Sequence, residues 1–205
     1  MKSVVAFFSS ILFATIVMAN DIAPDALIKS VSGEVLEIVR ADRDIQSGNT
    51  KKAADLVERK IAPNFDFLHM TRLALGRDWR QASTEQQKAL ANEFQILLVR
   101  TYSRALTEYK NQTIDIKPLA LKAGETDVKV RSEIKQPGAK SIQLDYYLQK
   151  GTTGWKIYDI EVAGISLVTN YRESFASEVR NSGIDGLLKA LQTKNESGDT
   201  VAIKK

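Results

Sequence analysis

The 205-residue sequence predicts one α+β domain, in which several helices pack on one face of an antiparallel sheet of about four strands. In the second half of the chain, apolar and polar residues alternate in several short stretches, as they do in half-buried strands. On both sides of this region, apolar residues recur every three or four positions, as in amphipathic helices. Between residues 155 and 175 the first pattern changes into the second at Ala163-Gly164. A strand at the edge of the sheet is therefore expected to lead directly into a helix.

Four helices are expected before the sheet, and most of them have a recognisable start or end. Pro63 ends the second helix, and Gly76 lies where a C-cap glycine is expected after the third. Ser83 and Gln86 have the spacing of a capping box at the start of the fourth. The polar segment 41–49 is expected to be a loop between the first two. The four helices are expected at 23–40, 50–61, 65–75 and 83–109.

Four strands are expected in the sheet, and glycine-containing segments between them indicate short hairpin connections. The alternation is clearest in the third strand, where Leu144 and Tyr146 share one face and Asp145 and Tyr147 share the other. One face of the sheet is therefore apolar and the other solvated. In the last strand the first apolar residues are out of phase with the later ones, which indicates a β-bulge. The strands are expected at 113–117, 127–135, 141–150 and 155–162.

After the sheet, apolar residues from Ile165 to Val179 follow the helical period, and a final amphipathic helix is expected at 184–191. From Lys194 to residue 205 the chain is polar and is expected to form a flexible tail. The folded domain is therefore expected to span residues 20–193.

The first 19 residues are typical of a secretory signal peptide. Lys2 precedes an apolar stretch, and small residues precede an expected cleavage point after Ala19. The stretch is short for a membrane span, and a retained anchor is the alternative.

The chain has no cysteine, so neither a disulfide nor a lipid attached to cysteine is expected. Removing Lys2 leaves 28 of the 29 basic residues against 25 acidic ones, a formal charge of +3. This charge suits an anionic membrane surface and does not indicate a nucleic-acid partner.

The sequence shows no catalytic signature. It has one histidine, His69, and no cysteine, which leaves only carboxylates for metal binding or acid–base chemistry. Nucleophile-elbow, phosphate-loop and dinucleotide-binding motifs do not occur. Ser132 and Lys135 resemble a serine–lysine pair, but residues three apart on a strand point to opposite faces. We therefore expect no enzymatic activity, no metal and no cofactor.

The apolar faces of the long helix, of the third helix and of the sheet are expected to meet in one interior. This interior is either a closed core or a cavity for an apolar ligand, because cores and cavity linings have the same composition. On the pattern alone, the tight packing of native interiors favours the closed core.

Several short stretches of the sequence form one set of motifs in the order of the chain, from Phe65 to Lys194. They are 65–67 (FDF), 70–72 (MTR), 75–80 (LGRDWR), Phe94, 97–102 (LLVRTY), 106–109 (LTEY), 158–168 (YDIEVAGISLV), 170–172 (NYR), 183–187 (GIDGL) and Lys194. This set resembles the MlaC family, the toluene-tolerance proteins, which are periplasmic phospholipid carriers.

The resemblance implies a fold similar to nuclear-transport-factor-2-like proteins, with a deep apolar pocket that holds the tails of a phospholipid. It implies a monomeric carrier whose cargo moves between an outer-membrane lipoprotein–porin complex and an inner-membrane ABC transporter with a membrane-anchored periplasmic subunit. Such a carrier maintains outer-membrane lipid asymmetry. The alternative is a ligand-free periplasmic adaptor subunit of an ABC transporter, with a closed core.

Because the resemblance favours the cavity, apolar residues on the inward faces are expected to bind lipid. They are Phe67, Met70, Phe94, Leu98, Val130, Ile134, Leu144, Tyr146, Leu148, Ile160 and Val162.

A group of arginines offers cations for the phosphate of a lipid headgroup. They are Arg72, Arg77, Arg80, Arg100 and Arg104. An exposed basic face for solubility or partner docking explains them equally well. An exposed guanidinium adds little to affinity, about 0–1 kcal/mol per pair, so the acyl tails are expected to dominate binding.

Overall fold

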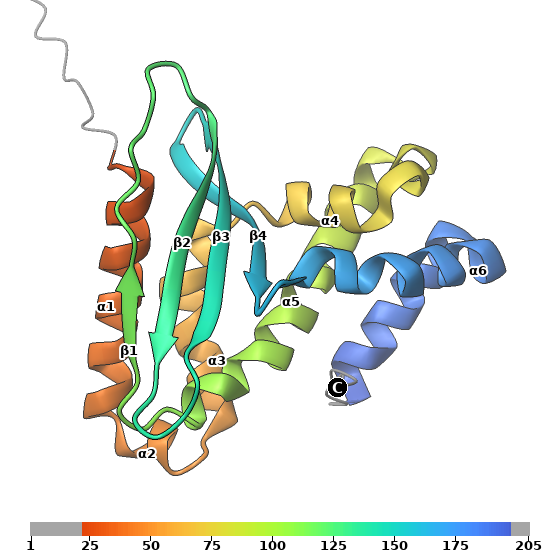
Figure 1. The fold of residues 1–205 in the computed structure, drawn as a ribbon. Helices are drawn as coiled ribbons and strands as arrows, with labels where there is room; N and C mark the ends of the chain where they lie inside the picture. The colour runs from red at the N-terminus through yellow and green to blue at the C-terminus, as the bar shows by residue number, and fades with distance from the viewer. Residues whose placement is uncertain (1–21, 198–205) are drawn as a thin grey trace, which may run out of the picture.

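The computed structural model describes residues 22–197 (Figure 1). The predicted signal peptide, 1–19, lies outside the described residues, and so does 198–205, the larger part of the predicted tail. The described chain combines one antiparallel sheet with helices, which confirms the α+β class.

The sheet has five strands, one more than the sequence predicted, and they lie side by side in the order of the chain. All neighbouring strands are antiparallel. The fifth strand has only two residues, too few for an alternating pattern to show, so the helix expected from Ile165 begins instead at Leu167. The strands are β1 (Thr113–Ile116), β2 (Asp127–Lys135), β3 (Ile142–Gly151), β4 (Gly154–Val162) and β5 (Ile165–Ser166).

The β-bulge predicted in the last long strand is confirmed at Tyr158. Tyr147 of β3 pairs with Asp159, and the next residue of β3, Leu148, pairs with Ile157, so Tyr158 has no partner across the ladder. The extra residue shifts the alternation by one position. Apolar residues on both sides of the bulge therefore face the interior, although they are out of phase in the sequence.

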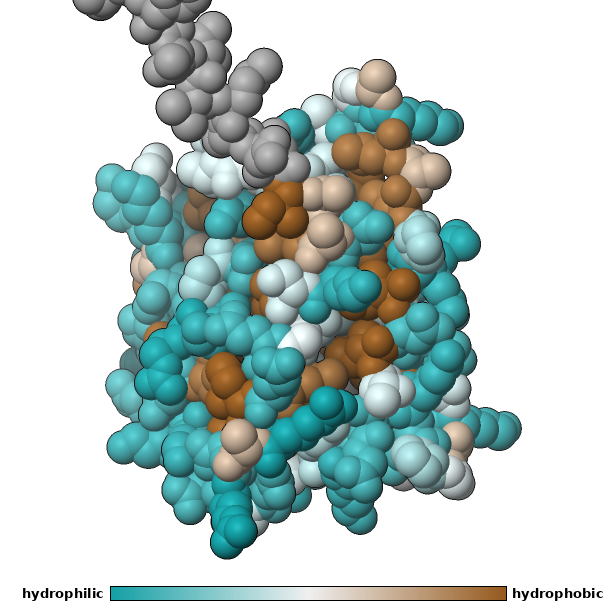
Figure 2. Space-filling model, turned by 90° about the vertical axis from the view of Figure 1, so that its left-hand side faces the viewer, coloured by the Kyte–Doolittle hydropathy of each residue, from teal (hydrophilic) through white to brown (hydrophobic). Residues whose placement is uncertain are grey.

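The helices form two groups around the sheet (Figure 1). α1, α3 and the C-terminal part of α5 lie behind one face of the sheet, whereas α4, α6 and the N-terminal part of α5 form a helical layer beyond β4. Seen from the side of α1, the surface is mainly polar, with separate apolar patches (Figure 2). The helical segments are α1 (Pro24–Ala41), α2 (Arg43–Gln46), α3 (Thr50–Leu56), the π-helix η1 (Val57–Ile61), η2 (Ala62–Asn64), α4 (Phe67–Leu75), η3 (Gly76–Gln81), α5 (Thr84–Thr107) and α6 (Leu167–Ser197).

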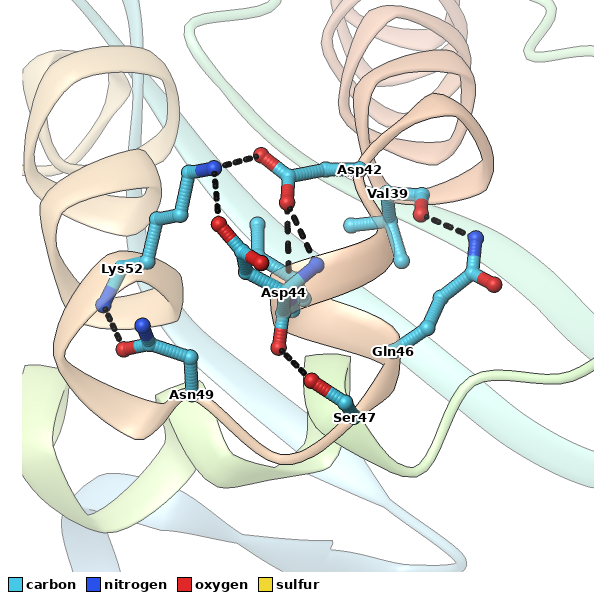
Figure 3. Close-up of polar contacts among 8 residues, drawn as sticks. Val39, Asp42, Asp44, Gln46, Ser47, Asn49 and Lys52 are labelled. Carbon is cyan, nitrogen blue, oxygen red and sulfur yellow. Dashed lines mark hydrogen bonds and ion pairs between the residues drawn. The ribbon is translucent and has the colours of Figure 1, made fainter.

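The segment 41–49 is not the simple loop that the sequence predicted, because the one-turn helix α2 forms within it. The Asp42 carboxylate caps this helix by accepting hydrogen bonds from the N–H groups of Asp44 (3.0 Å) and Ile45 (3.2 Å). The Lys52 ammonium on α3 lies 2.7 Å from the Asp42 carboxylate and 3.0 Å from that of Asp44 (Figure 3). Ile45 is buried between α1 and α3. A single buried side chain gives no periodicity, so the sequence pattern missed this turn.

The two helices expected after the sheet are both present within α6, where the backbone leaves the helical conformation at Gly183 and the direction of the chain changes. The φ of Gly183 is 71°, which glycine adopts readily and other residues rarely do. After the kink the helix packs along α5, and the Asn195 amide donates to the Glu93 carboxylate at 2.7 Å. The helix continues to Ser197, so the first residues of the expected tail, from Lys194, are helical.

The buried apolar residues form three clusters. The first joins α4, α5 and α6 around Phe94, and we call it the helical core. The second packs Val130 and Leu148 of the sheet against Ile28 of α1, and we call it the sheet core. The third joins α1, α2 and α3 around Val39.

Candidate functional site

A cavity of about 710 Å³ lies between the inner face of the sheet and α1, η1 and α5. Its volume is within the range of small-molecule sites, roughly 300–1,000 Å³. Most of the residues that line it are apolar. They are Ile28, Val31, Ser32, Val35, Leu36, Ile61, Phe65, Ala105, Leu106, Glu108, Tyr109, Lys110, Gln112, Ile114, Ile134, Gln136, Ile142, Leu144, Tyr146, Ile157 and Ile160.

The inner face of the sheet is divided between the cavity and the sheet core. Along β3, Leu144 lines the cavity and is half-buried, whereas Leu148, four residues further on, is 0% exposed in the sheet core. The same division occurs on β2, where Ile134 lines the cavity and Val130 is 0% exposed. Residues on one face of one strand therefore have two different roles, which depend on what lies opposite them.

Helices supply the opposite wall of the cavity. Val31 and Val35 are four residues apart on α1 and so lie on the same side of that helix. Leu106 comes from the last turn of α5, and Ile61 from the last position of the π-helix η1. Single turns of π-helix are frequent at functional sites.

The polar residues of the lining gather at one end, where α5 and β2 end and β3 begins. Glu108, Lys110 and Gln136 are exposed there, and Ile142 beside them is 41% exposed. The cavity therefore opens to solvent at this end, which we call the mouth. Apolar patches between polar side chains are visible on the side of the molecule that α1 occupies (Figure 2).

A contact at the mouth ties the end of α1 to the end of α5. The Arg40 Nε donates to the Tyr109 hydroxyl at 2.6 Å, and this hydroxyl donates to the Gln112 carbonyl at 3.1 Å. The Arg40 guanidinium also lies over the Tyr109 ring, 5.7 Å from its centre. Because Tyr109 and Gln112 both line the cavity, this contact fixes part of its wall.

The inner end of the cavity is uncharged. Tyr146 lies there almost completely buried, and this burial raises the pKa of its hydroxyl to about 12, so the group is neutral at physiological pH. Ser132, next to it on the sheet, is buried and donates to the Leu144 carbonyl at 2.7 Å. The two charged residues of the lining, Glu108 and Lys110, are both at the mouth.

The structure brings four of the predicted lipid-binding residues together at the cavity, namely Ile134, Leu144, Tyr146 and Ile160. Their contact with lipid stays a prediction. The three other predicted sheet residues share the apolar face but lie outside the lining. Val130 and Leu148 belong to the sheet core, and Val162 is half-buried where β4 pairs with β5.

The four predicted helical residues lie away from the cavity, because Phe67, Met70, Phe94 and Leu98 pack in the helical core. Helical periodicity identifies the buried face of a helix but not the neighbour that buries it. α5 has 24 residues, and at 1.5 Å per residue it is about 36 Å long. α4 and α6 cover its N-terminal part, so only its last turns reach the cavity.

The sequence analysis did not predict that α1, β1 and the end of α5 form much of the cavity wall. Val31 and Val35 do stand out as part of an apolar stripe on the first predicted helix. This stripe was a usable signal, because α1 is a helix with one apolar side and needs a partner surface. Ile114 of β1 gave no such signal, since its strand has only four residues.

The five arginines singled out in the sequence are all absent from the cavity lining. Arg72 is exposed on α4, and Arg77 and Arg80 are exposed on η3. Arg100 and Arg104 line a different hollow on another side of α5.

The single histidine does not belong to a metal-binding cluster. His69 stacks on Tyr158 with ring centres 4.5 Å apart, and burial lowers the pKa of its imidazole. Within residues 22–197 there is no group of three or more His, Cys, Asp or Glu side chains that could hold a metal ion. In the same part of the chain, no helix combines the length and the apolar character needed to span a bilayer.

Comparisons with known proteins match most of this chain. Residues 29–193 match the family model described as MlaC protein. The intermembrane phospholipid transport system binding protein MlaC of Haemophilus influenzae is 27% identical over 190 residues, which cover 87% of this chain and 89% of that protein. The toluene tolerance protein ttg2D of Pseudomonas putida is 23% identical over 163 residues, 79% of this chain and 75% of that protein.

A solved structure shares both the fold and much of the sequence. The phospholipid-binding protein from Ralstonia solanacearum, solved in complex with a phospholipid, is 38% identical and superposes with a TM-score of 0.77. The match covers 85% of this chain and 97% of that one. With the family match over residues 29–193, these findings confirm the resemblance seen in the sequence. This chain belongs to the MlaC family.

Proposed function

We propose that this protein is a periplasmic phospholipid carrier that holds acyl chains in the cavity and leaves the headgroup at the mouth. This proposal rests on the distribution of charged residues along the cavity. The charged lining residues, Glu108 and Lys110, are at the mouth, and the wall behind them is apolar. A phospholipid has the same division between a charged head and uncharged tails. The phospholipid bound by the Ralstonia protein, which is 38% identical, supports the assignment.

The cavity lining is apolar surface that is not fully covered by the protein itself. Native interiors are packed as densely as organic crystals and leave few voids larger than a water molecule. A cavity of about 710 Å³ with half-buried residues such as Leu144 and Ile160 departs from that rule. An apolar ligand would restore the missing contacts.

The energetics of acyl chains suit a carrier. Burying one methylene stabilises by about 0.8 kcal/mol relative to water, so a two-tailed lipid with on the order of 30 methylenes gains roughly 20 kcal/mol or more. Spontaneous release into water is therefore negligible. Transfer to a membrane is nearly neutral, because the methylenes leave one apolar environment for another. The partners, not the carrier, then set the direction of transport.

We further propose that the carrier works as a monomer between an outer-membrane lipoprotein–porin complex and an inner-membrane ABC transporter with its membrane-anchored periplasmic subunit. This transport would maintain outer-membrane lipid asymmetry without a catalytic step. The name of the Haemophilus relative, an intermembrane phospholipid transport system binding protein, supports this role. A signal peptide cleaved after Ala19 would place the protein in the periplasm.

The experiment is to purify the mature protein gently from bacterial cells, extract it with organic solvent and identify lipids by mass spectrometry. We expect co-purified phospholipid, with native mass spectra showing the protein and its lipid as one complex. The competing function is a ligand-free adaptor of an ABC transporter. Protein that is lipid-free after gentle purification, and that stays lipid-free when mixed with vesicles, would favour the adaptor.

A further inference from the structure

A second hollow, of about 410 Å³, lies where α3, α5 and α6 meet, and its lining is mostly polar and basic. It contains four cations, three hydroxyl groups and no carboxylate. The lining residues are Thr50, Lys51, Ala54, Leu97, Arg100, Thr101, Ser103, Arg104, Lys194 and Asn195. We call it the basic pocket.

The basic pocket is separate from the lipid cavity. The two share no lining residue, although both use α5. Successive residues of an α-helix turn by about 100°, so Arg100 and Arg104 lie roughly a third to almost half of a turn away from Leu106 around the helix axis. Arg100 therefore does not belong to the mouth of the lipid cavity, although Arg104 lies 3.5 Å from the Glu108 carboxylate there.

Arg100 forms no ion pair in the part of the chain that the structure describes. Its side chain is half-buried, and its guanidinium donates a hydrogen bond to the Lys194 carbonyl at 3.5 Å. Charged side chains are seldom buried without an opposite charge. The carboxylate of Glu93 lies nearby but accepts a hydrogen bond from the Asn195 amide at 2.7 Å.

The other cations add to this unbalanced charge. Arg104 pairs with Glu108 at 3.5 Å, but both side chains are about two-thirds exposed, so this pair is weak. Lys51 is exposed at the start of α3, and Lys194 is half-buried on α6. Three elements that are distant in the sequence thus bring positive charge to one concave place. Ser103 also lines the pocket, and this residue is 2% exposed.

We propose that the basic pocket binds a terminal phosphate group. Phosphate carries about −1.5 to −2 charges and three strong acceptor oxygens as a monoester. Arginine, lysine and hydroxyl groups are the side chains that commonly bind phosphate oxygens. A single carboxylate has one charge and two oxygens, so it would leave more of the donors in the pocket unpaired. The phosphate comes from one of two sources, the headgroup of a membrane lipid or a free phosphate in solution.

The first arm of the test titrates the protein with inorganic phosphate at low ionic strength and follows binding by calorimetry. We expect Arg100→Gln to weaken binding at least tenfold, and Lys194→Gln to weaken it several-fold. Arg77→Gln is the matched control, because it removes the same charge from an exposed site on η3 outside both hollows. We expect its affinity to stay within twofold of the native protein, and circular dichroism checks that each variant is folded.

The second arm distinguishes the sources of phosphate by flotation with vesicles that contain phosphatidic acid, a lipid whose headgroup is a phosphate monoester. If Arg100→Gln reduces vesicle binding several-fold more than Arg77→Gln, the site takes a lipid headgroup. If the native protein binds inorganic phosphate but the two variants float equally, the site takes a free phosphate.

Three results would overturn the proposal. In the first, the native protein binds neither inorganic phosphate nor the vesicles. In the second, Arg100→Gln and Arg77→Gln have equal affinities for both probes. In the third, the protein binds poly-glutamate and not phosphate, and this binding requires Arg100. The last result would assign the pocket to an acidic protein partner. The proposal does not depend on the carrier function, because the lipid that co-purifies with Arg100→Gln is expected to equal that of the native protein.

Discussion

Leu144 and Leu148 offer a direct test of whether the cavity exists, because they have the same side chain on the same face of β3. Leu148 is 0% exposed in the sheet core, whereas Leu144 lines the cavity. Truncating a fully packed leucine to alanine costs about 2–5 kcal/mol, because transfer energy and packing are both lost. We expect Leu148→Ala to fall in this range. Leu144→Ala removes atoms that already face open space, so in lipid-free protein its cost is expected to be about 1 kcal/mol or less.

The assay is urea unfolding of lipid-free protein, followed by circular dichroism, together with thermal unfolding. For a chain of this size 1 kcal/mol corresponds to a shift in Tm of about 2–4 °C. Leu148→Ala is then expected to lower Tm by roughly 4–20 °C, and Leu144→Ala by a few degrees at most. Equal losses at the two positions would refute the reasoning, because they would show that Leu144 is packed as tightly as Leu148.

Charged substitutions extend the test from stability to lipid content. Leu144→Arg places a cation beside the acyl chains at a cost of several kcal/mol, about the cost of burying an unpaired polar group or more. Water can enter the cavity from the mouth, so we expect the variant to remain helical but to purify without lipid. Tyr146→Glu should behave in the same way, since Tyr146 also lines the cavity. Global unfolding of both variants would support the closed core.

Three further predictions concern the surface and the mouth. Arg77→Ala and Arg80→Ala should leave lipid content unchanged but slow lipid transfer to partner complexes, most strongly at low salt where charge steering is greatest; loss of lipid would show instead that they bind the headgroup. Tyr109→Phe removes both hydrogen bonds of this hydroxyl at the mouth, worth about 0.5–1.5 kcal/mol each, and should speed the exchange of fluorescent lipid with vesicles at least roughly twofold; an unchanged rate would exclude this contact as a barrier. Two neighbouring lysine ammonium groups lower the pKa of Asp115 from 3.8 to about 2, so its contribution to stability is complete above pH 3.8 and is lost as the pH falls toward 2. The difference in unfolding free energy between native protein and Asp115→Asn should shrink over that range and in 1 M salt, and a constant difference would contradict the assignment.

The sheet could be predicted well because its signals are local. The four predicted strands match β1 to β4 to within a residue or two, and the phase change between Ile157 and Ile160 indicated the bulge at Tyr158. Where a feature had too few residues for a period to show, the prediction failed. The two residues of β5 and the single turn around Ile45 are examples.

The candidate site could be predicted only in part, because a period identifies a buried face but not what lies opposite it. Leu144 and Leu148 are indistinguishable in the sequence, yet one lines the cavity and the other is fully packed. Phe94 and Leu106 belong to the same long helix and have different neighbours, α6 for Phe94 and the cavity for Leu106. This information depends on the three-dimensional path of the chain and is not present in any short stretch.

The division of packing would allow the proposed carrier to be emptied without unfolding. The helical core around Phe94 and the sheet core around Leu148 contain completely buried side chains that do not line the cavity. Loss of the ligand therefore removes contacts with Leu144 and its neighbours but leaves the helical core, and Val130 and Leu148 of the sheet core, with all of their contacts. A ligand that binds only the folded state adds stability that grows with its concentration relative to Kd, so the filled protein should be the more stable form. Most of the folding stability therefore comes from residues outside the cavity. The residues of the cavity wall can then bind and release an apolar ligand without unfolding the protein.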